Sequence, residues 1–231
     1  MTRTATFARE QLRAPFTLVL LLGVPAIFVT ASASVLSDFA DALGGSLAGD
    51  AASALGAGWA AAFIAGTLGF FQAASSRGAD RRLALAGGRA WRIALSRLGA
   101  SLTLAVAASA AAYTALLLRT GVSHPWHAAV AVLAFALVYL SIGIAIGSLV
   151  TAPLEGSLAV AFVFLLDVFS GPGMAESAAP YSLSRKPADI LIAAGLGQGS
   201  SSEDWLKLLG VVAAALGLAI VVFAWTARSR T

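Results

Sequence analysis

The chain has 231 residues, of which 59% are hydrophobic and 11% are charged, a balance typical of membrane proteins and not of soluble domains. It contains no cysteine, which excludes disulfides, thiolate chemistry and cysteine-based metal sites. The formal net charge is +4, but the arginines flank apolar segments instead of forming a separate basic patch. We therefore do not expect a nucleic-acid partner.

Six apolar stretches follow one another along the chain. A helix needs roughly 20 apolar residues to cross a hydrocarbon core of about 30 Å, and six such helices leave room only for short loops and two modest excursions. The sequence therefore predicts one all-α membrane domain over residues 1–231, with six transmembrane helices and no soluble catalytic domain. The predicted spans are residues 14–33, 54–74, 98–118, 127–150, 153–170 and 205–227.

The basic residues divide unequally between the two sides of these spans. Eleven of the 15 lysines and arginines fall on one side and four on the other. The positive-inside rule then places both termini and the loop between spans two and three in the cytoplasm of a multi-pass plasma-membrane protein. The larger group is Arg3, Arg9, Arg13, Arg77, Arg81, Arg82, Arg89, Arg92, Arg97, Arg228 and Arg230, and the smaller one is Arg119, Arg185, Lys186 and Lys207.

The N-terminal region has a second interpretation. Basic residues, an apolar run and then Ala31-Ser32-Ala33 also resemble a secretory signal with a small-residue cleavage site. The apolar run is long for a signal sequence, so we favour a first transmembrane helix.

The loop over residues 75–97 is rich in arginine. Its segment 80–86 suits a short helix, which we expect Gly87-Gly88 to terminate because glycine is the usual helix stop. Such a helix between two spans can act as a lever for a cytoplasmic partner. Alternatively, its arginines only set the topology and contact lipid phosphates.

Two features inside the later spans stand out. Gly143 and Gly147 form a small-xxx-small pair that allows close helix packing. Asp167 is the one acidic residue well inside a predicted span. An ionised Asp at a helix centre costs roughly 2.5–3.5 kcal/mol on insertion scales, and such residues commonly face a polar cavity or a partner. The alternative is structural: Asp167 caps the outer loop or hydrogen-bonds a neighbouring helix.

The predicted outer loop, residues 171–204, contains an apolar piece over residues 188–194. This piece is too short to cross a bilayer. We expect a re-entrant or interfacial helix that is tolerated only when it packs against protein. The following stretch, residues 195–202, reads as a flexible linker.

Enzymatic signatures are weak. His124 and His127 are the only histidines, and without nearby carboxylates they make a poor metal site. There is no HExxH metalloprotease motif and no GxxxxGK[ST] phosphate-binding loop. Ser170 lacks a reachable histidine and is a poor nucleophile. We therefore predict no catalytic residues, no bound cofactor and no metal, and expect the chain not to be an enzyme.

Taken together, this organisation resembles a type-2 ABC transporter permease, the exporter-type membrane subunit. The resemblance lies in six spans with both ends inside, in the segment ADRRLALAGGRAWRIALSR between spans two and three, and in a short turn with Pro153 and Glu155. It also includes Phe169-Ser170-Gly171-Pro172-Gly173-Met174 and Pro180-Tyr181-Ser182-Leu183. The bulky residue that usually precedes the proline after Ser-Gly is lacking here.

The resemblance implies a permease dimer, identical or mixed, with two separately encoded ATPase subunits that bind the ATP. The loop between spans two and three would be the coupling helix, with Asp80, Arg81, Arg82, Leu83 and Leu85 docking on the ATPase. Asp167 and Phe164 would line a path for a lipid, drug or peptide-like substrate. Two other functions stay open: a non-transporting membrane scaffold and, least favoured, an intramembrane hydrolase.

Overall fold

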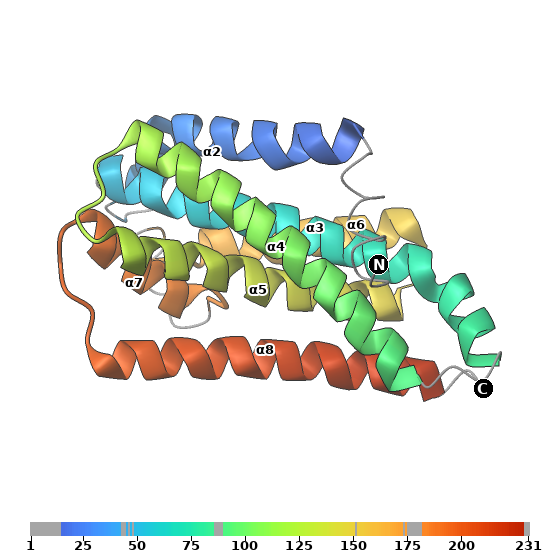
Figure 1. The fold of residues 1–231 in the computed structure, drawn as a ribbon. Coiled ribbons are helices and arrows are strands. Elements are labelled where there is room, and N and C mark those ends of the chain that lie inside the picture. Colours follow the sequence, from blue (N-terminus) through green and yellow to red (C-terminus); the bar gives the residue numbers. More distant parts are fainter. Residues whose placement is uncertain are drawn as a thin grey trace.

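The computed structural model describes residues 15–42, 45, 47, 49–85, 90–150, 152–172, 174 and 182–228. Within helices, the side chains of residues 76–85, 90–97, 223, 224, 227 and 228 are outside this description, as are several in the first helix. The regular secondary structure of the described residues consists of α-helices (Figure 1). The helices are α2 (Pro15–Ala42), α3 (Gly49–Leu85), α4 (Ala90–Arg119), α5 (Pro125–Leu149), α6 (Pro153–Phe169), α7 (Arg185–Gly195) and α8 (Ser202–Arg228).

Four segments of these helices are long and apolar enough to cross a membrane: Gly49–Ser75, Leu98–Arg119, Pro125–Leu149 and Ser202–Val222. They match the second, third, fourth and sixth predicted spans, and they are the segments expected of a membrane protein. The first and fifth predicted spans correspond to α2 and α6. Because α6 has 17 residues, it is about 25 Å long, somewhat less than a typical hydrocarbon core. The full count of six spans stays a prediction.

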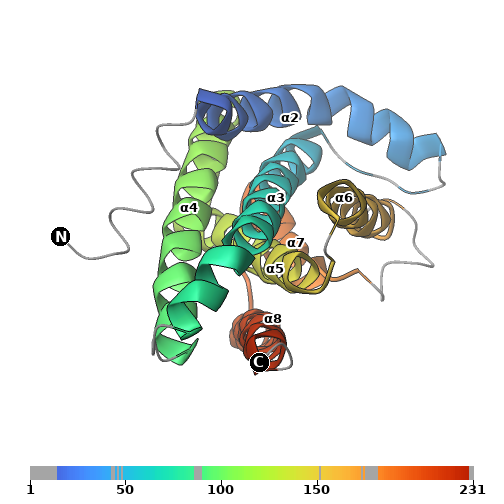
Figure 2. The same cartoon turned by 90° about the vertical axis from the view of Figure 1, so that its right-hand side faces the viewer.

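The helix α3 lies at the centre of the bundle. It packs against α2, α4, α5, α6 and α7, and 83% of an 18-residue apolar stretch within it is buried. In contrast, only 11% of the corresponding stretch of α8 is buried, and α8 lies at the side of the bundle (Figure 2). The long helices run in alternating directions (Figure 1). The end of α3, the start of α4 and the end of α8 therefore share one end, the α3–α4 end, and the α4–α5 connection lies at the other, the α4–α5 end.

The contact between α3 and α5 depends on glycine. A Cβ on Gly143 would overlap the carbonyl oxygen of Gly66, and a Cβ on Gly147 would lie 2.6 Å from the carbonyl oxygen of Phe70. On the α3 side, a Cβ on Gly69 would lie 2.8 Å from the carbonyl oxygen of Leu140. The obstacles are backbone atoms, which cannot turn aside. Gly143 and Gly147 therefore lie in a close helix crossing, the α3–α5 glycine seam, which is the geometry that small residues permit.

The end of α3 differs from the sequence prediction. We expected a span ending near residue 74 and a separate short helix over residues 80–86, but one helix runs from Gly49 to Leu85. The physical reason is that residues 75–85 are polar without being helix-breaking. They contain no proline and a single glycine, Gly78, which costs about 1 kcal/mol in a helix. Hydropathy marks where the apolar part ends, not where the helix ends.

Candidate functional site

The most polar buried point among the described residues is at the end of α6. Asp167 lies two residues before the helix ends at Phe169, and its exposed fraction is only 4%. The helix stops there because Pro172 cannot continue it, and Ser170 caps its last turn. The amide nitrogen and the hydroxyl of Ser170 both donate to the carbonyl oxygen of Leu166, at 3.0 Å and 2.6 Å.

The carboxylate of Asp167 accepts four hydrogen bonds. The hydroxyl of Tyr139 on α5 donates to Oδ2 at 2.7 Å. The other oxygen, Oδ1, accepts from the hydroxyl of Ser182 at 2.9 Å and from the amides of Leu183 at 2.6 Å and Ser184 at 3.3 Å. A buried carboxylate is tolerated when hydrogen bonds replace its lost hydration. We call this group of five residues the Asp167 joint, because it connects α5, α6 and the start of α7.

An aromatic cluster surrounds the joint on the side of α2 and α3. The ring of Phe164, one turn before Asp167, lies 5.2 Å from that of Phe63, 5.8 Å from that of Tyr139 and 6.3 Å from that of Phe28. These centroid distances are within the range of favourable aromatic pairs. The cluster brings together side chains of α2, α3, α5 and α6, and it keeps one side of the joint apolar, where hydrogen bonds to a charge are stronger than in water.

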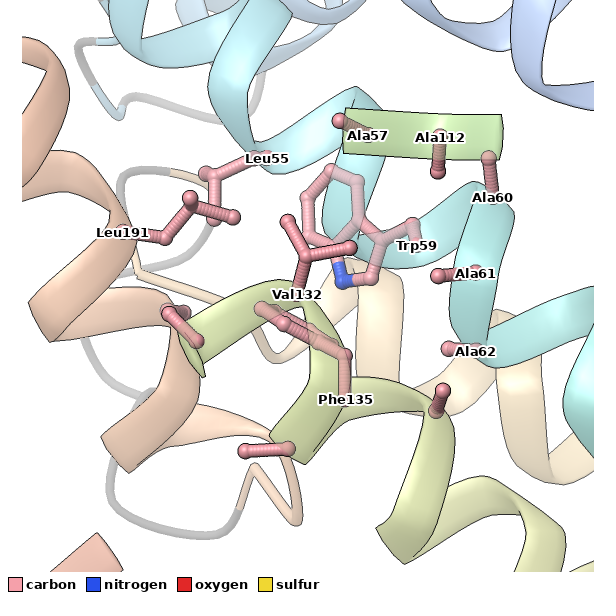
Figure 3. Close-up of a cluster of buried hydrophobic side chains, with 14 of the residues drawn as sticks. Leu55, Ala57, Trp59, Ala60, Ala61, Ala62, Ala112, Val132, Phe135 and Leu191 are labelled. Atoms are coloured by element: carbon pink, nitrogen blue, oxygen red, sulfur yellow. The ribbon is translucent and has the colours of Figure 1, made fainter. Parts of the chain in front are cut away.

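The helix α7 presents one apolar face to the bundle. Its buried residues are Pro187, Ala188, Ile190, Leu191 and Ala194. Figure 3 shows Leu191 pointing toward Leu55 of α3, in a cluster that includes Trp59, Val132 and Phe135. The expectation that the apolar piece over residues 188–194 packs against protein is therefore confirmed.

The end of α7 is ordered by a glycine. Gly197 has φ of +72°, a conformation that favours glycine. The amide of Gln198 donates to the carbonyl of Ala193 at 2.8 Å, which is the long bond of a Schellman helix end. The first part of the stretch that we interpreted as a flexible linker is thus a defined helix cap.

Lys186 forms surface ion pairs within α7 and with α8. The ammonium group of Lys186 lies 3.3 Å from a carboxylate oxygen of Asp189 and 3.9 Å from one of Asp204 at the start of α8. These side chains are 27–36% exposed, so each pair contributes less than about 1 kcal/mol. The buried joint holds α7 more firmly than these pairs do.

The structure places the two groups of predicted site residues far apart. Asp167 and Phe164 are close together and buried within a single chain, at 4% and 5% exposure. Asp80, Arg81, Arg82, Leu83 and Leu85 are in the last part of α3, and their side chains lie outside the described residues. Phe63, which touches Phe164, is 17 residues before Asp80 and 22 before Leu85 on the same helix, so about 26 to 33 Å of one helix separates the two groups.

The geometry at Asp167 matches the structural alternative, a carboxylate that hydrogen-bonds a neighbouring helix and the chain that follows its own helix. Sequence reasoning did not assign its partners. Tyr139 is 28 residues before Asp167 and Ser182 is 15 residues after it, and no local pattern relates them. The one available signal was the rule that a buried carboxylate needs donors.

The two histidines lie near each other at the start of α5, with ring centroids 5.3 Å apart, and His127 also contacts the ring of Trp205 on α8 at 5.2 Å. Within the part of the chain that the structure describes, no group of three His, Asp or Glu side chains is positioned to hold a metal ion.

No known protein-family model matches the chain, and no curated protein matches it in sequence.

Proposed function

We propose that this chain is the membrane-spanning permease subunit of an ATP-driven exporter, working with separately encoded ATPase subunits. The observation that supports this most is the continuity of α3. By sequence its apolar run ends at Ala74, before Ser75-Ser76-Arg77, and the helix continues from Ser75 for ten more residues to Leu85, a further 15 Å or so. A central helix that projects beyond the apolar layer and carries Arg77, Arg81 and Arg82 offers a docking element for a protein in the cytoplasm.

The proposed topology has six spans with both termini in the cytoplasm. The alternating helix directions in Figure 1 bring the end of α3, the start of α4 and the end of α8 to one end of the bundle. The larger group of arginines belongs to these segments, to residues next to them in the sequence or to the N-terminus. The positive-inside rule assigns this end to the cytoplasm. The α4–α5 end, with Arg119, then faces outward.

In this proposal, nucleotide-driven movement of the ATPase is transmitted by α3. A push on the last turns of α3 cannot be absorbed at a loop, because the helix is continuous into the core. The glycine seam then passes the displacement to α5, since the backbones of α3 and α5 touch there. Near its start, α3 contacts α7 through Gly58, where a Cβ would lie 3.0 Å from Leu191.

The substrate is proposed to be a lipid, a drug or a peptide-like molecule, and a second permease chain would complete the path. Phe164 and Asp167 remain our predicted path residues. Both are buried inside one chain, so substrate contact requires α6 to separate from its neighbours during transport. Phe164 lies at the boundary with α2, and the contact there is aromatic, Phe28 against Phe164.

Co-purification tests the proposal. We expect the tagged chain to copurify with an ATPase and to stimulate its activity in a bilayer. The double variant Arg81→Glu, Arg82→Glu should reduce the stimulated rate at least tenfold, as loss of a few kcal/mol of charged contacts would, without lowering expression. Arg119→Glu is the matched control at the opposite end and should leave ATPase stimulation intact.

Two results would contradict the proposal. An ATPase rate in the double variant equal to that of the unchanged chain would show that α3 has no coupling role. A chain that carries no ATPase under any mild extraction would instead be the non-transporting scaffold.

A further inference from the structure

The start of α7 has an acceptor that its own sequence does not supply. The first amides of a helix have no partner within the helix and carry a partial positive charge. At α7 the N-cap residue is Ser184, whose side chain makes no capping bond and whose hydroxyl has no hydrogen-bond partner among the described residues. Asp167 of α6 instead accepts the amides of the two residues that lead into the helix, Leu183 and Ser184.

The same carboxylate is anchored on its other side. Tyr139, which donates to Oδ2 at 2.7 Å, has no exposed surface and is one turn before Gly143 in the glycine seam. The two oxygens of Asp167 are therefore bound to different elements, Oδ2 to α5 and Oδ1 to the chain entering α7. A shift of α6 relative to α5 must stretch one set of bonds or the other.

The other attachments of α7 are weaker or less directional. Its ion pair with α8, Lys186 to Asp204, is partly exposed, and its apolar face packs on side chains such as Leu55, Val132 and Phe135 through contacts that have no preferred direction. At Gly171, just after α6, a Cβ would lie 2.9 Å from the ring of Trp59, so the exit from α6 is also placed closely against α3. The Asp167 joint is thus the buried, directional attachment of α7, beside the apolar packing of its inner face.

We propose that Asp167 is a positioning residue that acts as the releasable catch of α7, holding this helix against α3 and α5 at the α4–α5 end. With the catch closed, α7 covers that end of the bundle. When α6 moves relative to α5, the catch opens and α7 leaves. The opening of this catch during transport rests on the proposed function, but the hydrogen-bonded attachment of α7 to Asp167 does not.

A single thiol at the joint tests the catch. The chain has no native cysteine, and Ser184→Cys is nearly isosteric at a side chain that is 0% exposed. In this background we would measure the rate of alkylation by N-ethylmaleimide in nanodiscs, because only a thiol that water and reagent reach forms the reactive thiolate. Asp167→Asn should raise the rate about tenfold or more, since it removes a charged acceptor of four bonds.

Milder variants make the test independent of gross misfolding. Tyr139→Phe and Ser182→Ala each remove one bond to the carboxylate and should raise the rate by a smaller factor. Asp189→Asn is the matched control: it makes the same chemical change on α7, at a carboxylate that pairs at the surface with Lys186, and it should leave the rate within about twofold.

A second probe separates release of α7 from general loosening. Ser109 on α4 is 6% exposed and is distant from the joint in sequence. A thiol placed there by Ser109→Cys should stay unreactive in all these variants. If Asp167→Asn loosens both probes alike, Tyr139→Phe and Ser182→Ala decide. A selective rise at the Ser184→Cys probe in these two supports the catch, and an unchanged rate overturns it.

Measurements of ATP hydrolysis and export distinguish this inference from the proposed function. In complex with an ATPase, Asp167→Asn should keep ATP hydrolysis but lose its coupling to export, whereas Asp189→Asn should keep both. If the Ser184→Cys probe is labelled selectively but no ATPase copurifies, the catch is supported and the proposed transport function is wrong. An ATPase partner with unchanged labelling in Tyr139→Phe and Ser182→Ala would remove the catch alone.

Discussion

The α3–α5 glycine seam and the Asp167 joint hold neighbouring parts of the molecule by opposite means. In the seam, backbones touch because Gly66 and Gly143 have no side chains. In the joint, one carboxylate gathers donors from α5 and from the chain before α7. The seam holds by shape and tolerates no added atom, whereas the joint holds by directed bonds that can be removed one at a time.

The difference shows how a small membrane protein can combine a rigid part with a movable one. Helix association within lipid depends on close packing, since lipid tails are as apolar as leucine side chains. A seam of glycines therefore gives one well-defined fit. Hydrogen bonds to a carboxylate can be exchanged for water when a segment leaves, so the joint is the place where we expect movement.

The largest effect is expected in the seam. Gly143→Ala places a Cβ against the carbonyl oxygen of Gly66, and α3 and α5 must separate to admit it. We expect a loss of about 2–3 kcal/mol of unfolding free energy, at the upper end for overpacking, measured by unfolding in mixed micelles. Gly217→Ala on α8 is the control, because its Cβ would meet nothing within 4 Å. Equal stability of the two variants would show that the seam is not tight.

An intermediate effect is expected at two neighbouring serines of the joint. Ser182→Ala removes a bond to Asp167 and should cost about 1 kcal/mol. Ser184→Ala keeps its amide bond to Asp167 and removes a hydroxyl without a partner among the described residues, so the unfolding free energy should stay unchanged or rise slightly. The same unfolding assay checks both, and a larger loss for Ser184→Ala would contradict the arrangement.

The smallest effect is expected at the surface link between α7 and α8. Lys186→Met removes the pairs with Asp189 and Asp204 while keeping an unbranched apolar stem. We expect a change below about 0.5 kcal/mol that disappears at high salt, because exposed pairs are screened. A loss larger than that of Ser182→Ala would mean that ion pairs, and not the carboxylate of Asp167, hold α7.

Several parts of this picture were accessible from local sequence. The spacing of Gly143 and Gly147 indicated a packing face, and the apolar piece over residues 188–194 indicated a short helix packed on protein. Their partners were not accessible. Gly66 and Phe70 in α3 are more than 70 residues before the residues they contact, and only the crossing of two helices brings them together.

The segment after residue 74 shows that hydropathy does not report where a helix ends. Its polar residues led us to separate a short helix from the span, although nothing in residues 75–85 breaks a helix. The change from apolar to polar side chains reports a change of surroundings. Helix continuity depends on backbone propensity and on the absence of proline, which is a separate property.

The all-helical character, the apolar segments long enough to cross a membrane and the uneven distribution of arginines follow from the sequence, because these depend on composition and on neighbours within a few turns. The donors that surround Asp167, the central place of α3 and the start of α7 beside the carboxylate of another helix become visible only in the folded chain. Those choices depend on contacts between residues distant in the chain, where shape and hydrogen-bond geometry select one partner among many of similar chemistry.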